Sequence, residues 1–480
     1  MLNQNQTPLL DALKACTTHA HAPFYTPGHK RGEGIAQPLA DLFGTKVFRA
    51  DLTELADLDN LFAPQGVIQA AQKLAAEAFG AAQTWFLVNG STCGIEAAIL
   101  ATCGTGDKII LPRNVHSSVI SGLILSGAIP IFLNPEYDSV LDIAHSITPE
   151  AVQVALQKHP DAKAVLVVYP TYYGVCGNLQ AIAHITHQYH IPLLVDEAHG
   201  AHFAFHPDLP PSALATGADL TVQSTHKVLG AMTQASMLHV QGHRIDIDRV
   251  SKALQLVQST SPSYILLASL DAARQQMALH GKALMSRTLS LADIARRRIS
   301  EIPGLSVLQM PNLDPTRLTV TVFGLGFTGF AAEEILDEKL GVTAELASLQ
   351  HLTFIISLGN TASDIEQLVQ GLMRLGSGEW GVGSGESMRK GFFVWDDNLG
   401  CVSPREAFFA VSEILPLSQT SDRICTEIVC PYPPGIPILM PGELITPGAL
   451  EYLQQVLSMG GLISGCADTS LQTLKVVRNS

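Results

Sequence analysis

The sequence is poor in charged residues, which make up 15% of its 480 positions, against roughly 25% in an average globular chain. Hydrophobic residues account for 47% of the chain. A disordered chain combines low hydrophobicity with high charge, so this composition excludes an intrinsically disordered protein. At roughly 150 residues per domain, the length predicts about three domains, or one large domain with smaller additions.

Basic side chains are scarce as well. The chain has 29 Lys and Arg against 43 Asp and Glu, which gives a net charge of −14. Nucleic-acid binders depend on basic side chains that neutralise phosphates, so this balance argues against a nucleic-acid partner. An acidic surface weakly attracts cationic small molecules, although ordinary solubility is the simpler explanation of the charge.

The sequence also lacks long apolar runs and clustered cysteines. No run reaches the 18 or so uncharged apolar residues, about 30 Å of helix, that a membrane span requires. The N-terminus has neither a basic stretch nor a long apolar one, so no signal peptide is visible. The eight cysteines form no C-x-x-C pair and have no histidine cluster beside them. We therefore expect no metal and no membrane partner, and a cytoplasmic location.

The first two thirds of the chain alternate between strand-like and helix-like patterns. Apolar strand-like runs lie at 85–88, 108–111, 129–133, 164–168 and 192–195. Helical patterns lie at 67–79, 91–102, 117–125 and 179–189, with another helix start at Thr148-Pro149. Strands that are apolar throughout and alternate with helices indicate a mostly parallel sheet covered on both faces. The sequence therefore predicts a large α/β domain.

After a long helical stretch at 264–302, the pattern changes to that of a smaller α+β domain. Strands are expected at 317–323 and 351–358, and helices at 331–340 and 361–375. The Gly/Ser-rich stretch 376–391 is predicted to be a linker. We therefore divide the chain into four parts: an N-terminal segment 1–60, a large domain 61–290, a small α+β domain 291–378 and a C-terminal α+β domain 379–480.

The strongest chemical signal is a lysine just past the end of a predicted strand. Lys227 closes the segment VQSTHK at 222–227. Ligands bind α/β sheets at this rim, and desolvation there lowers the pKa of an ammonium from about 10.4 toward neutrality. A neutral amine is a nucleophile, although an isolated lysine at a strand end is more often an ordinary surface residue.

Two further features are predicted to reach the same rim. Asp196 ends the apolar run 193–195, and a buried carboxylate requires a cationic partner such as a protonated pyridine nitrogen. The junction NGSTCG places Gly90, Ser91 and Thr92 at the start of a helix, where backbone amides and hydroxyls bind anions. Taken alone, each is as well explained as a simple cap.

Together these features indicate one cofactor. A nucleophilic lysine, an aspartate suited to a pyridinium and a phosphate-binding helix N-terminus predict pyridoxal 5′-phosphate (PLP). His116, in the loop PRNVH, adds an aromatic ring after another predicted strand.

The run STHKVLGAMTQAS at 224–236 resembles the cofactor-attachment signature of the Orn/Lys/Arg decarboxylase family. Further motifs of that family extend over nearly the whole chain: TPGHKRG (26–32), FLVNGSTCG (86–94), PRNVHSS (112–118), PTYYG (170–174), DEAHGAHF (196–203), TSPSYILLASLDAA (260–273), SPREAFFA (403–410) and PYPPGIPILMPGE (431–443). The resemblance implies a PLP-dependent transferase (aspartate-aminotransferase-like) fold, with a mostly parallel sheet in the large domain, a smaller α+β domain and a C-terminal α+β domain.

The resemblance also assigns roles to residues. It implies that Lys227 bonds covalently to PLP, that Asp196 pairs with the pyridine nitrogen and that His116 stacks on the ring. His199 stands where some members carry Trp, and would contact the ring edge or handle a proton. The phosphate would be held around Gly90 by a set of side chains: Ser91, Thr92, Ser224 and His226. Lys227 or His226 is the candidate acid that returns a proton to the substrate.

The implied reaction is decarboxylation of a basic L-amino acid to an amine and CO₂. Arginine is favoured over lysine and ornithine, because short family members without an N-terminal wing domain are often arginine decarboxylases. Candidate carboxylates for the cationic tail of the substrate are Asp51, Glu54, Glu406, Glu427 and Glu443. The family also implies at least a homodimer with the active site at the interface, completed by the segment 259–264.

Two alternatives remain open at this point. Another PLP enzyme of the same fold, such as an aminotransferase or an aldolase, would share the lysine and the aspartate. A regulator that has lost catalysis is disfavoured, because Lys227 and Asp196 are both present.

Overall fold

The computed structural model describes residues 2–380, 402–432 and 434–479. The chain divides into two compact units, Met1–Thr102 with Leu194–Met285 and Cys103–Leu193 with Ser286–Ser480. Residues 381–391 of the predicted linker lie outside the described residues. Within the described part of the chain, no helix is both long enough and apolar enough to cross a membrane.

The first unit is built on strands in the order β1 (Gln83–Leu87), β9 (Ser236–Val240), β8 (Leu220–Gln223) and β7 (Leu193–Asp196). β7 and β8 are parallel, whereas β9 runs antiparallel to both β8 and β1. Only the one-turn helix α9 (Thr225–Val228) separates β8 from β9. A helix of one turn cannot cross the face of the sheet as the helix of a parallel crossover does, and β9 returns antiparallel to β8.

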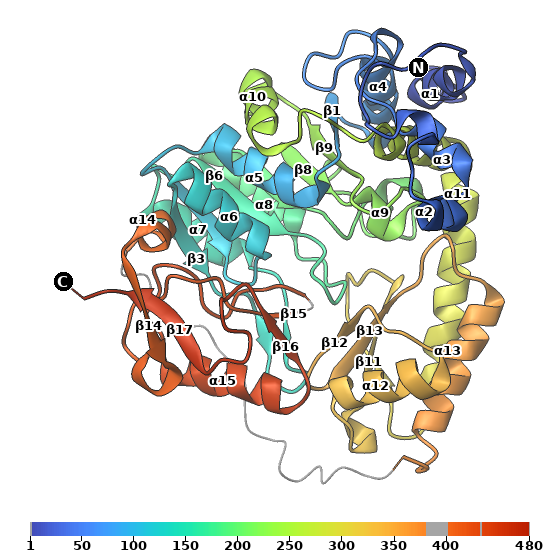
Figure 1. The fold of residues 1–480 in the computed structure, drawn as a ribbon. Coiled ribbons are helices and arrows are strands. Elements are labelled where there is room, and N and C mark those ends of the chain that lie inside the picture. Colours follow the sequence, from blue (N-terminus) through green and yellow to red (C-terminus); the bar gives the residue numbers. More distant parts are fainter. Residues whose placement is uncertain (1, 381–401, 433, 480) are drawn as a thin grey trace. The chain divides into compact units, whose positions relative to one another are not determined.

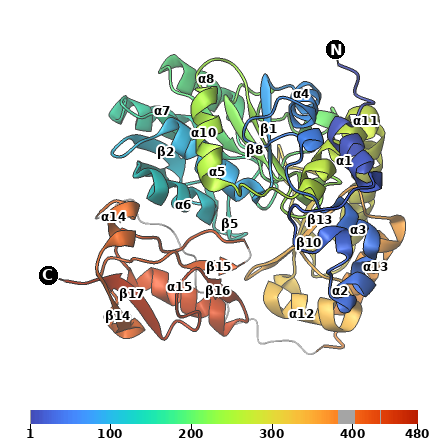
Figure 2. The ribbon, with the colours of Figure 1, turned by 45° about the horizontal axis from the view of Figure 1, so that its top comes forward.

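Helix α5 (Gly90–Thr102) lies directly on these strands. A Cβ atom at Gly94 would come within 2.7 Å of Leu87 Cδ1 and of Val222 Cγ1, so glycine permits the close contact between helix and sheet. Helix α10 (Ile247–Val257) packs against α5, as Figure 2 shows. The remaining elements of this unit are α1 (Pro8–Thr18), η1 (Lys30–Gly32), α2 (Gln37–Phe43), α3 (Thr45–Ala50), η2 (Ala56–Leu58), α4 (Val67–Phe79), η3 (Phe203–Phe205) and the first part of α11 (Tyr264–Ser300).

A buried ion pair on α11 holds the start of the chain. The Arg274 guanidinium lies 2.5 Å from Asp271 Oδ1, and neither side chain is exposed. Asp271 Oδ2 also accepts hydrogen bonds from the Leu9 and Leu10 N–H groups, at 3.0 and 3.3 Å. Arg274 donates to the Gln4 carbonyl at 2.9 Å. The pair therefore satisfies the open N-terminal end of α1 and fixes it to α11.

The second unit contains three parallel strands in the order β6 (Ala164–Val168), β2 (Lys108–Pro112) and β3 (Ile129–Leu133). Its helices α6 (Ser117–Ser126), α7 (Pro149–Lys158) and α8 (Leu179–Gln188) alternate with these strands along the chain. Thr148 caps α7 by accepting from the Ala151 N–H at 3.1 Å, as the Thr-Pro pair predicts. A short hairpin of β4 (Tyr137–Asp138) and β5 (Ile143–Ala144) follows β3.

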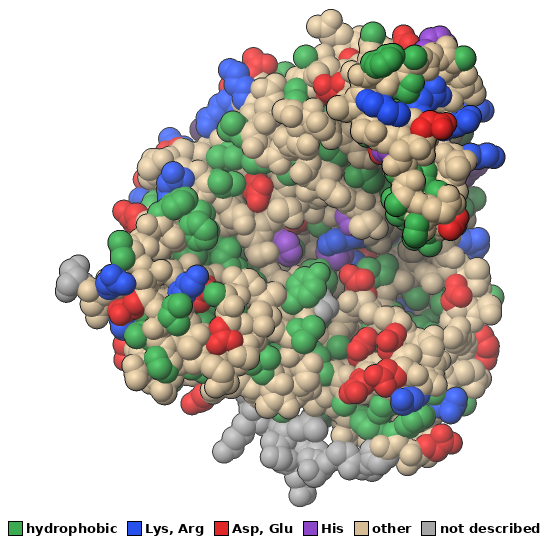
Figure 3. All heavy atoms as spheres, in the orientation of Figure 1, with side chains coloured by type: hydrophobic (Ala, Val, Ile, Leu, Met, Phe, Trp, Pro, Cys, Tyr) green, Lys and Arg blue, Asp and Glu red, His purple; other side chains and the backbone are tan. Residues whose placement is uncertain are grey.

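A four-stranded antiparallel sheet forms the next part of this unit. Its order is β10 (Ser306–Val307), β11 (Arg317–Thr321), β13 (His351–Ile355) and β12 (Leu346–Ala347). The turn η4 (Phe323–Leu325) follows β11, and helices α12 (Gly329–Leu340) and α13 (Ala362–Leu375) share one apolar core with the sheet. Acidic side chains gather over α12 in Figure 3. The pKa of Glu333 on this helix is raised by burial and by the neighbouring charges of Asp337 and Glu334.

The C-terminal part has its own small core. The strands pair as β14 (Ser412–Pro416) with β17 (Thr473–Val477), and β15 (Cys430–Tyr432) with β16 (Leu462–Ser464). Helix α15 (Pro447–Ser458) lies beside β14 and β17 in Figure 1, and its apolar side chains join their core. Helix α14 (Pro404–Phe409) begins with a capping box of Ser403 and Glu406, and η6 (Leu417–Gln419) follows β14.

The architecture is α/β with mostly parallel strands, followed by α+β elements, which confirms the predicted fold class. The division into two compact units does not test the four predicted parts of the chain, whose boundaries stay predictions.

Candidate active site

Lys227 lies on α9, immediately after the end of β8. Its Nζ atom is 3.1 Å from Nε2 of His199, and the Lys227 side chain is half-buried while His199 is buried. An amine this close to an imidazole can give its proton to the ring or take one back, because the unperturbed pKa of histidine lies near neutrality.

Asp196 lies at the end of β7, beside the end of β8. It stands opposite Val222 in the parallel register, and only 6% of it is exposed. Burial raises the pKa of Asp196, while the charge of Lys227 and a hydrogen bond from the Ala198 N–H lower it. Since burial outweighs the other two effects, an additional cation beside the carboxylate would stabilise its ionised form.

The N-terminus of α5 offers a site for an anion. Gly90 has φ +76°, and no atom lies within 4 Å of the position that a Cβ would take, so the backbone there is open. The Ser224 hydroxyl donates to Ser91 Oγ at 2.8 Å, while the Thr92 side chain is exposed. Thr225 Oγ1 is buried and has no hydrogen-bond partner among the described residues. A buried hydroxyl without a partner beside a helix N-terminus suits a ligand that supplies an acceptor.

His226 is oriented by the turn that leads into β9. Its Nδ1 lies 3.0 Å from the Ala235 carbonyl, which also accepts from the His226 backbone N–H at 3.2 Å. Because a carbonyl can only accept, the neutral ring carries its proton on Nδ1.

His116 belongs to the second unit. It caps α6 there, and its Nδ1 lies 3.2 Å from the Ser118 N–H. The next backbone N–H, that of Ser117, donates to the Gly435 carbonyl at 3.1 Å. The stacking role of His116 stays a prediction. The other predicted site residues all belong to the first unit: Gly90, Ser91, Thr92, Asp196, His199, Ser224, His226 and Lys227.

A buried ion pair that the sequence analysis missed joins the His116 loop to the C-terminal part. Arg113 donates from Nε and Nη2 to the two carboxylate oxygens of Glu443, at 3.0 and 2.8 Å. Arg113 also donates to the carbonyls of Pro437 and Ile438, and both charged side chains are at least 95% buried. Only the opposite charges within PRNVH and PGE hinted at this contact, since the two segments lie far apart in sequence.

Glu443 is therefore paired with a cation of its own chain, and its contact with a substrate tail stays a prediction. The other four candidate carboxylates also have partners within the protein. Glu427 accepts from the Ala467 and Lys475 N–H groups, and Glu406 from the Ser403 N–H and hydroxyl. The remaining contacts are His29 with Asp51 at 3.1 Å, and Asn60 and Leu61 with Glu54 at 2.6 and 3.2 Å.

The segment 259–264 is engaged within its own chain. The Ser259 N–H donates to Asn89 Oδ1 at 3.3 Å, and the Tyr264 hydroxyl donates to the Asp59 carbonyl at 2.6 Å. Tyr264 itself is fully buried.

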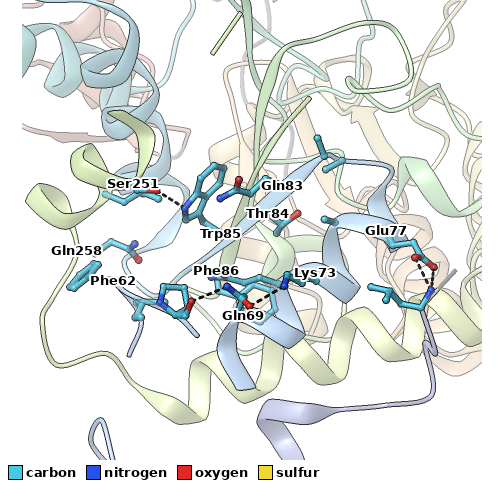
Figure 4. Close-up of a pocket in the computed structure, with 18 residues that line it drawn as sticks. Phe62, Gln69, Lys73, Glu77, Gln83, Thr84, Trp85, Phe86, Ser251 and Gln258 are labelled. Atoms are coloured by element: carbon cyan, nitrogen blue, oxygen red, sulfur yellow. Dashed lines mark hydrogen bonds between the residues drawn. The ribbon is translucent and has the colours of Figure 1, made fainter. Parts of the chain in front are cut away.

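A separate cavity of about 700 Å³ lies along β1, between α4 and α10 (Figure 4). Some of the polar groups on its wall bond to one another: Lys73 to Gln69 at 2.9 Å, Gln69 to the Pro64 carbonyl at 3.1 Å, and Trp85 to Ser251 at 3.2 Å. The residues that line it do not include Asp196 or Lys227. The cavity is therefore separate from the predicted site at the ends of β7 and β8.

Comparison with known proteins shows to which family the chain is similar. The family described as Orn/Lys/Arg decarboxylase, major domain, matches residues 7–311, and its C-terminal domain matches residues 401–469. The arginine decarboxylase of Bacillus subtilis is 40% identical over 485 residues and covers 99% of each chain. The arginine decarboxylase of Bacillus anthracis is 41% identical over 99% of this chain and 98% of its own. The solved constitutive lysine decarboxylase of Escherichia coli superposes with a TM-score of 0.83 at 22% identity, over 99% of this chain and 82% of that one, which shows the same fold.

Proposed function

This chain belongs to the Orn/Lys/Arg decarboxylase family and is a basic amino acid decarboxylase, and we propose that its substrate is L-arginine and its cofactor PLP. The observation that carries the choice of arginine is the identity of 40% and 41% with two arginine decarboxylases over 99% of this chain.

The residues of the first unit fit PLP. The open backbone at Gly90, the hydroxyls of Ser91 and Ser224, and the unpartnered Thr225 hydroxyl would hold its phosphate. The buried Asp196, whose pKa is raised by burial, would gain an additional cation in a protonated pyridine nitrogen. When bound, PLP supplies an electron sink for the electron pair that remains on the substrate as CO₂ leaves.

The protein's own groups would handle the protons. Asp196 would hold the proton on the pyridine nitrogen. Lys227 would supply the amine that anchors the cofactor, and His199 Nε2, at 3.1 Å from Lys227 Nζ, would accept and return its proton. Lys227 is therefore the better candidate for the acid than His226, whose Nδ1 faces the Ala235 carbonyl.

The proposal also covers His116 and the oligomeric state. His116 would stack on the cofactor ring. The active protein would be at least a homodimer, and light scattering of the purified enzyme would measure its mass. A cytoplasmic location stays a prediction from the scattered cysteines. The alternatives of an aminotransferase or an aldolase are disfavoured because the C-terminal domain of the decarboxylase family matches residues 401–469.

The direct test is incubation of the PLP-loaded enzyme with arginine, lysine and ornithine separately, followed by chromatography of the amines and measurement of released CO₂. We expect agmatine and an equal amount of CO₂ from arginine, without any 2-oxoacid acceptor. If cadaverine or putrescine formed faster than agmatine, the substrate would be lysine or ornithine and not arginine. An absolute requirement for a 2-oxoacid would overturn the decarboxylase itself.

A further inference from the structure

A row of polar side chains crosses the sheet of the first unit from its edge toward Asp196. In the strand register, Thr84 of β1 stands opposite His239 of β9, and His239 stands opposite Thr221 of β8. Gln223 lies on the same face of β8, two residues further along, because side chains alternate between the faces of a strand. The row ends at Glu197, the residue after Asp196 at the end of β7, whose carboxylate accepts hydrogen bonds from Thr221 and Gln223.

The hydrogen bonds of the row have one direction. Burial lowers the pKa of His239 to about 3, so its ring is neutral and has one donor and one acceptor. Gln223 donates from Nε2 to Glu197 at 2.8 Å, so its Oε1 faces His239 Nε2 at 3.2 Å as an acceptor. The ring proton is therefore on Nε2, and Nδ1 accepts from the Thr84 hydroxyl at 2.7 Å. Every bond thus points toward the Glu197 carboxylate.

Glu197 connects the two strands that carry the charged residues of the site. Its Oε2 accepts from Gln223 Nε2 and from the Thr221 hydroxyl at 2.9 Å, both on β8. Its Oε1 accepts from the Ala213 N–H at 2.8 Å, and its own N–H donates to the Val222 carbonyl at 2.9 Å. Glu197 is completely buried. Breaking any of these bonds would leave a buried polar group without a partner, so the contact is held firmly.

The position of this carboxylate in the chain gives it a consequence for catalysis. Asp196 directly precedes Glu197, and the segment Ser224–Lys227 directly follows Gln223. The bond between Glu197 and Gln223 therefore joins the strand ends from which Asp196 and Lys227 extend. The opposite face of β8 is fixed separately, because Val222 packs against Gly94 of α5.

We propose that Glu197 is a positioning residue of the decarboxylase: it acts through the ends of β7 and β8 to hold Asp196 and Lys227 at the separation that the cofactor requires. The inference rests on the proposed function, since it assumes that both residues act on PLP. Loss of the Glu197 carboxylate would let the two strand ends shift, and a displacement of about 1 Å can cost on the order of 100-fold in rate.

The first experiment compares Glu197→Ala with Asp271→Asn, a buried carboxylate of the same unit that holds α1. Both variants are loaded with PLP, and kcat and KM for arginine, thermal unfolding and the absorbance of the bound cofactor against pH are measured. We expect both to unfold at lower temperature. Only Glu197→Ala should lose kcat, by on the order of 10-fold to 100-fold with KM changed far less.

The absorbance titration is the readout that a merely structural role would not move. If Asp196 shifts, it holds the proton on the pyridine nitrogen less firmly, and the cofactor loses positive charge. The titration midpoint of the chromophore should therefore rise in Glu197→Ala and stay at the wild-type value in Asp271→Asn.

A second variant pair keeps the test decisive if Glu197→Ala fails to fold. Glu197→Gln places an amide against the Gln223 amide, and Gln223→Glu places two carboxylates together; the double variant E197Q/Q223E restores one donor opposite one acceptor. We expect each single variant to lose kcat and the double variant to recover most of it.

The outcomes separate the inference from the proposed function. Equal kcat and equal titration midpoints in Glu197→Ala and Asp271→Asn, or no recovery in the double variant, would overturn the positioning role. Failure of the wild-type enzyme to bind PLP at Lys227, measured by borohydride trapping and peptide mapping, would instead overturn the proposed function.

Discussion

Two buried glutamates, one in each unit, are stabilised by different chemistry. Glu443 of the second unit accepts hydrogen bonds from Nε and Nη2 of Arg113 and from the Met440 N–H. Glu197 of the first unit receives no cation among its hydrogen-bond donors, which are Gln223, Thr221 and Ala213. Removal of the partner from a buried ion pair leaves an uncompensated charge, whereas a buried carboxylate held by neutral donors has no cation to offset the loss of water.

The pKa of Glu197 reflects this difference. Burial raises the pKa of Glu197 to about 7, and the hydrogen bonds from Gln223, Ala213 and Thr221 lower it only in part. Asp196 and Glu197 are thus adjacent buried acids whose pKa values are both raised by burial. Acids with shifted pKa values cluster at active sites. The ion pair of Arg113 with Glu443 shows how the same chain stabilises a buried carboxylate elsewhere.

The largest expected effect separates chemistry from packing. Lys227→Ala should reduce arginine decarboxylation to background and abolish the absorbance band at about 420 nm, because no other amine replaces the bond to PLP. Since Lys227 is only half-buried, the free energy of unfolding should change little. Activity assays, absorbance and denaturant unfolding measure the three quantities. A retained band would show that Lys227 does not bind the cofactor.

The next effect tests the cation-paired glutamate. Arg113→Ala leaves the buried Glu443 without its charge partner and should reduce the free energy of unfolding by about 3 to 5 kcal/mol. The matched control is Arg297→Ala, because Arg297 and its partner Asp293 are 68% and 65% exposed and its loss should cost less than about 1 kcal/mol. Denaturant unfolding of both variants measures the difference, and equal losses would show that burial of the pair contributes nothing.

The third prediction concerns the glutamate held by neutral donors. Because the pKa of Glu197 is about 7 in the folded protein, against 4.5 ordinarily, the folded state binds the proton more tightly than the unfolded state. This carboxyl therefore stabilises the fold in its protonated form below about pH 4.5, and that contribution is lost as pH rises to about 7, by about 3 kcal/mol.

Glu197→Gln removes this titration. The difference in the free energy of unfolding between Glu197→Gln and the wild type should shift in favour of the variant as pH rises from about 4.5 to about 7. Denaturant unfolding across that range measures it, and a difference that is constant with pH would contradict the raised pKa.

The smallest expected effect concerns a polar group without a partner. Thr225→Val removes a buried hydroxyl that has no hydrogen-bond partner among the described residues, so the cofactor-free protein should be as stable as the wild type or slightly more stable. Binding of PLP should weaken by about 1 kcal/mol, or roughly fivefold in Kd, because the phosphate loses one donor. Fluorescence titration with PLP measures this. Unchanged affinity together with lower stability would contradict a role in the phosphate site.

Local sequence signals predicted most elements of the fold. The helical period at 67–79 became α4, and the Thr148-Pro149 start became the cap of α7. The antiparallel return of β9 could not be read from periodicity, because strand direction depends on the length of the connection and on the neighbouring strand.

For the site, the sequence indicated the residues that follow strand ends. Lys227 with His199 and Ser91 with Ser224 are contacts between such predicted positions, and the charge of Lys227 lowers the pKa of Asp196, all within one unit. The residues that support them were missed. Nothing in the local pattern distinguishes Thr84, Gln223 and His239 from ordinary strand residues, since their roles depend on which side chains face them across the sheet.

The sequence by itself determined the family, the chemistry and the order of the elements, because motifs and periodicities are carried by neighbouring positions. Only the tertiary structure decided how each buried charge is stabilised. It gave Glu443 a guanidinium from a loop far away in the chain and gave Glu197 three neutral donors. Both glutamates have the same side chain, and their different properties arise from the partners that folding brings within hydrogen-bond distance and from the removal of water around them.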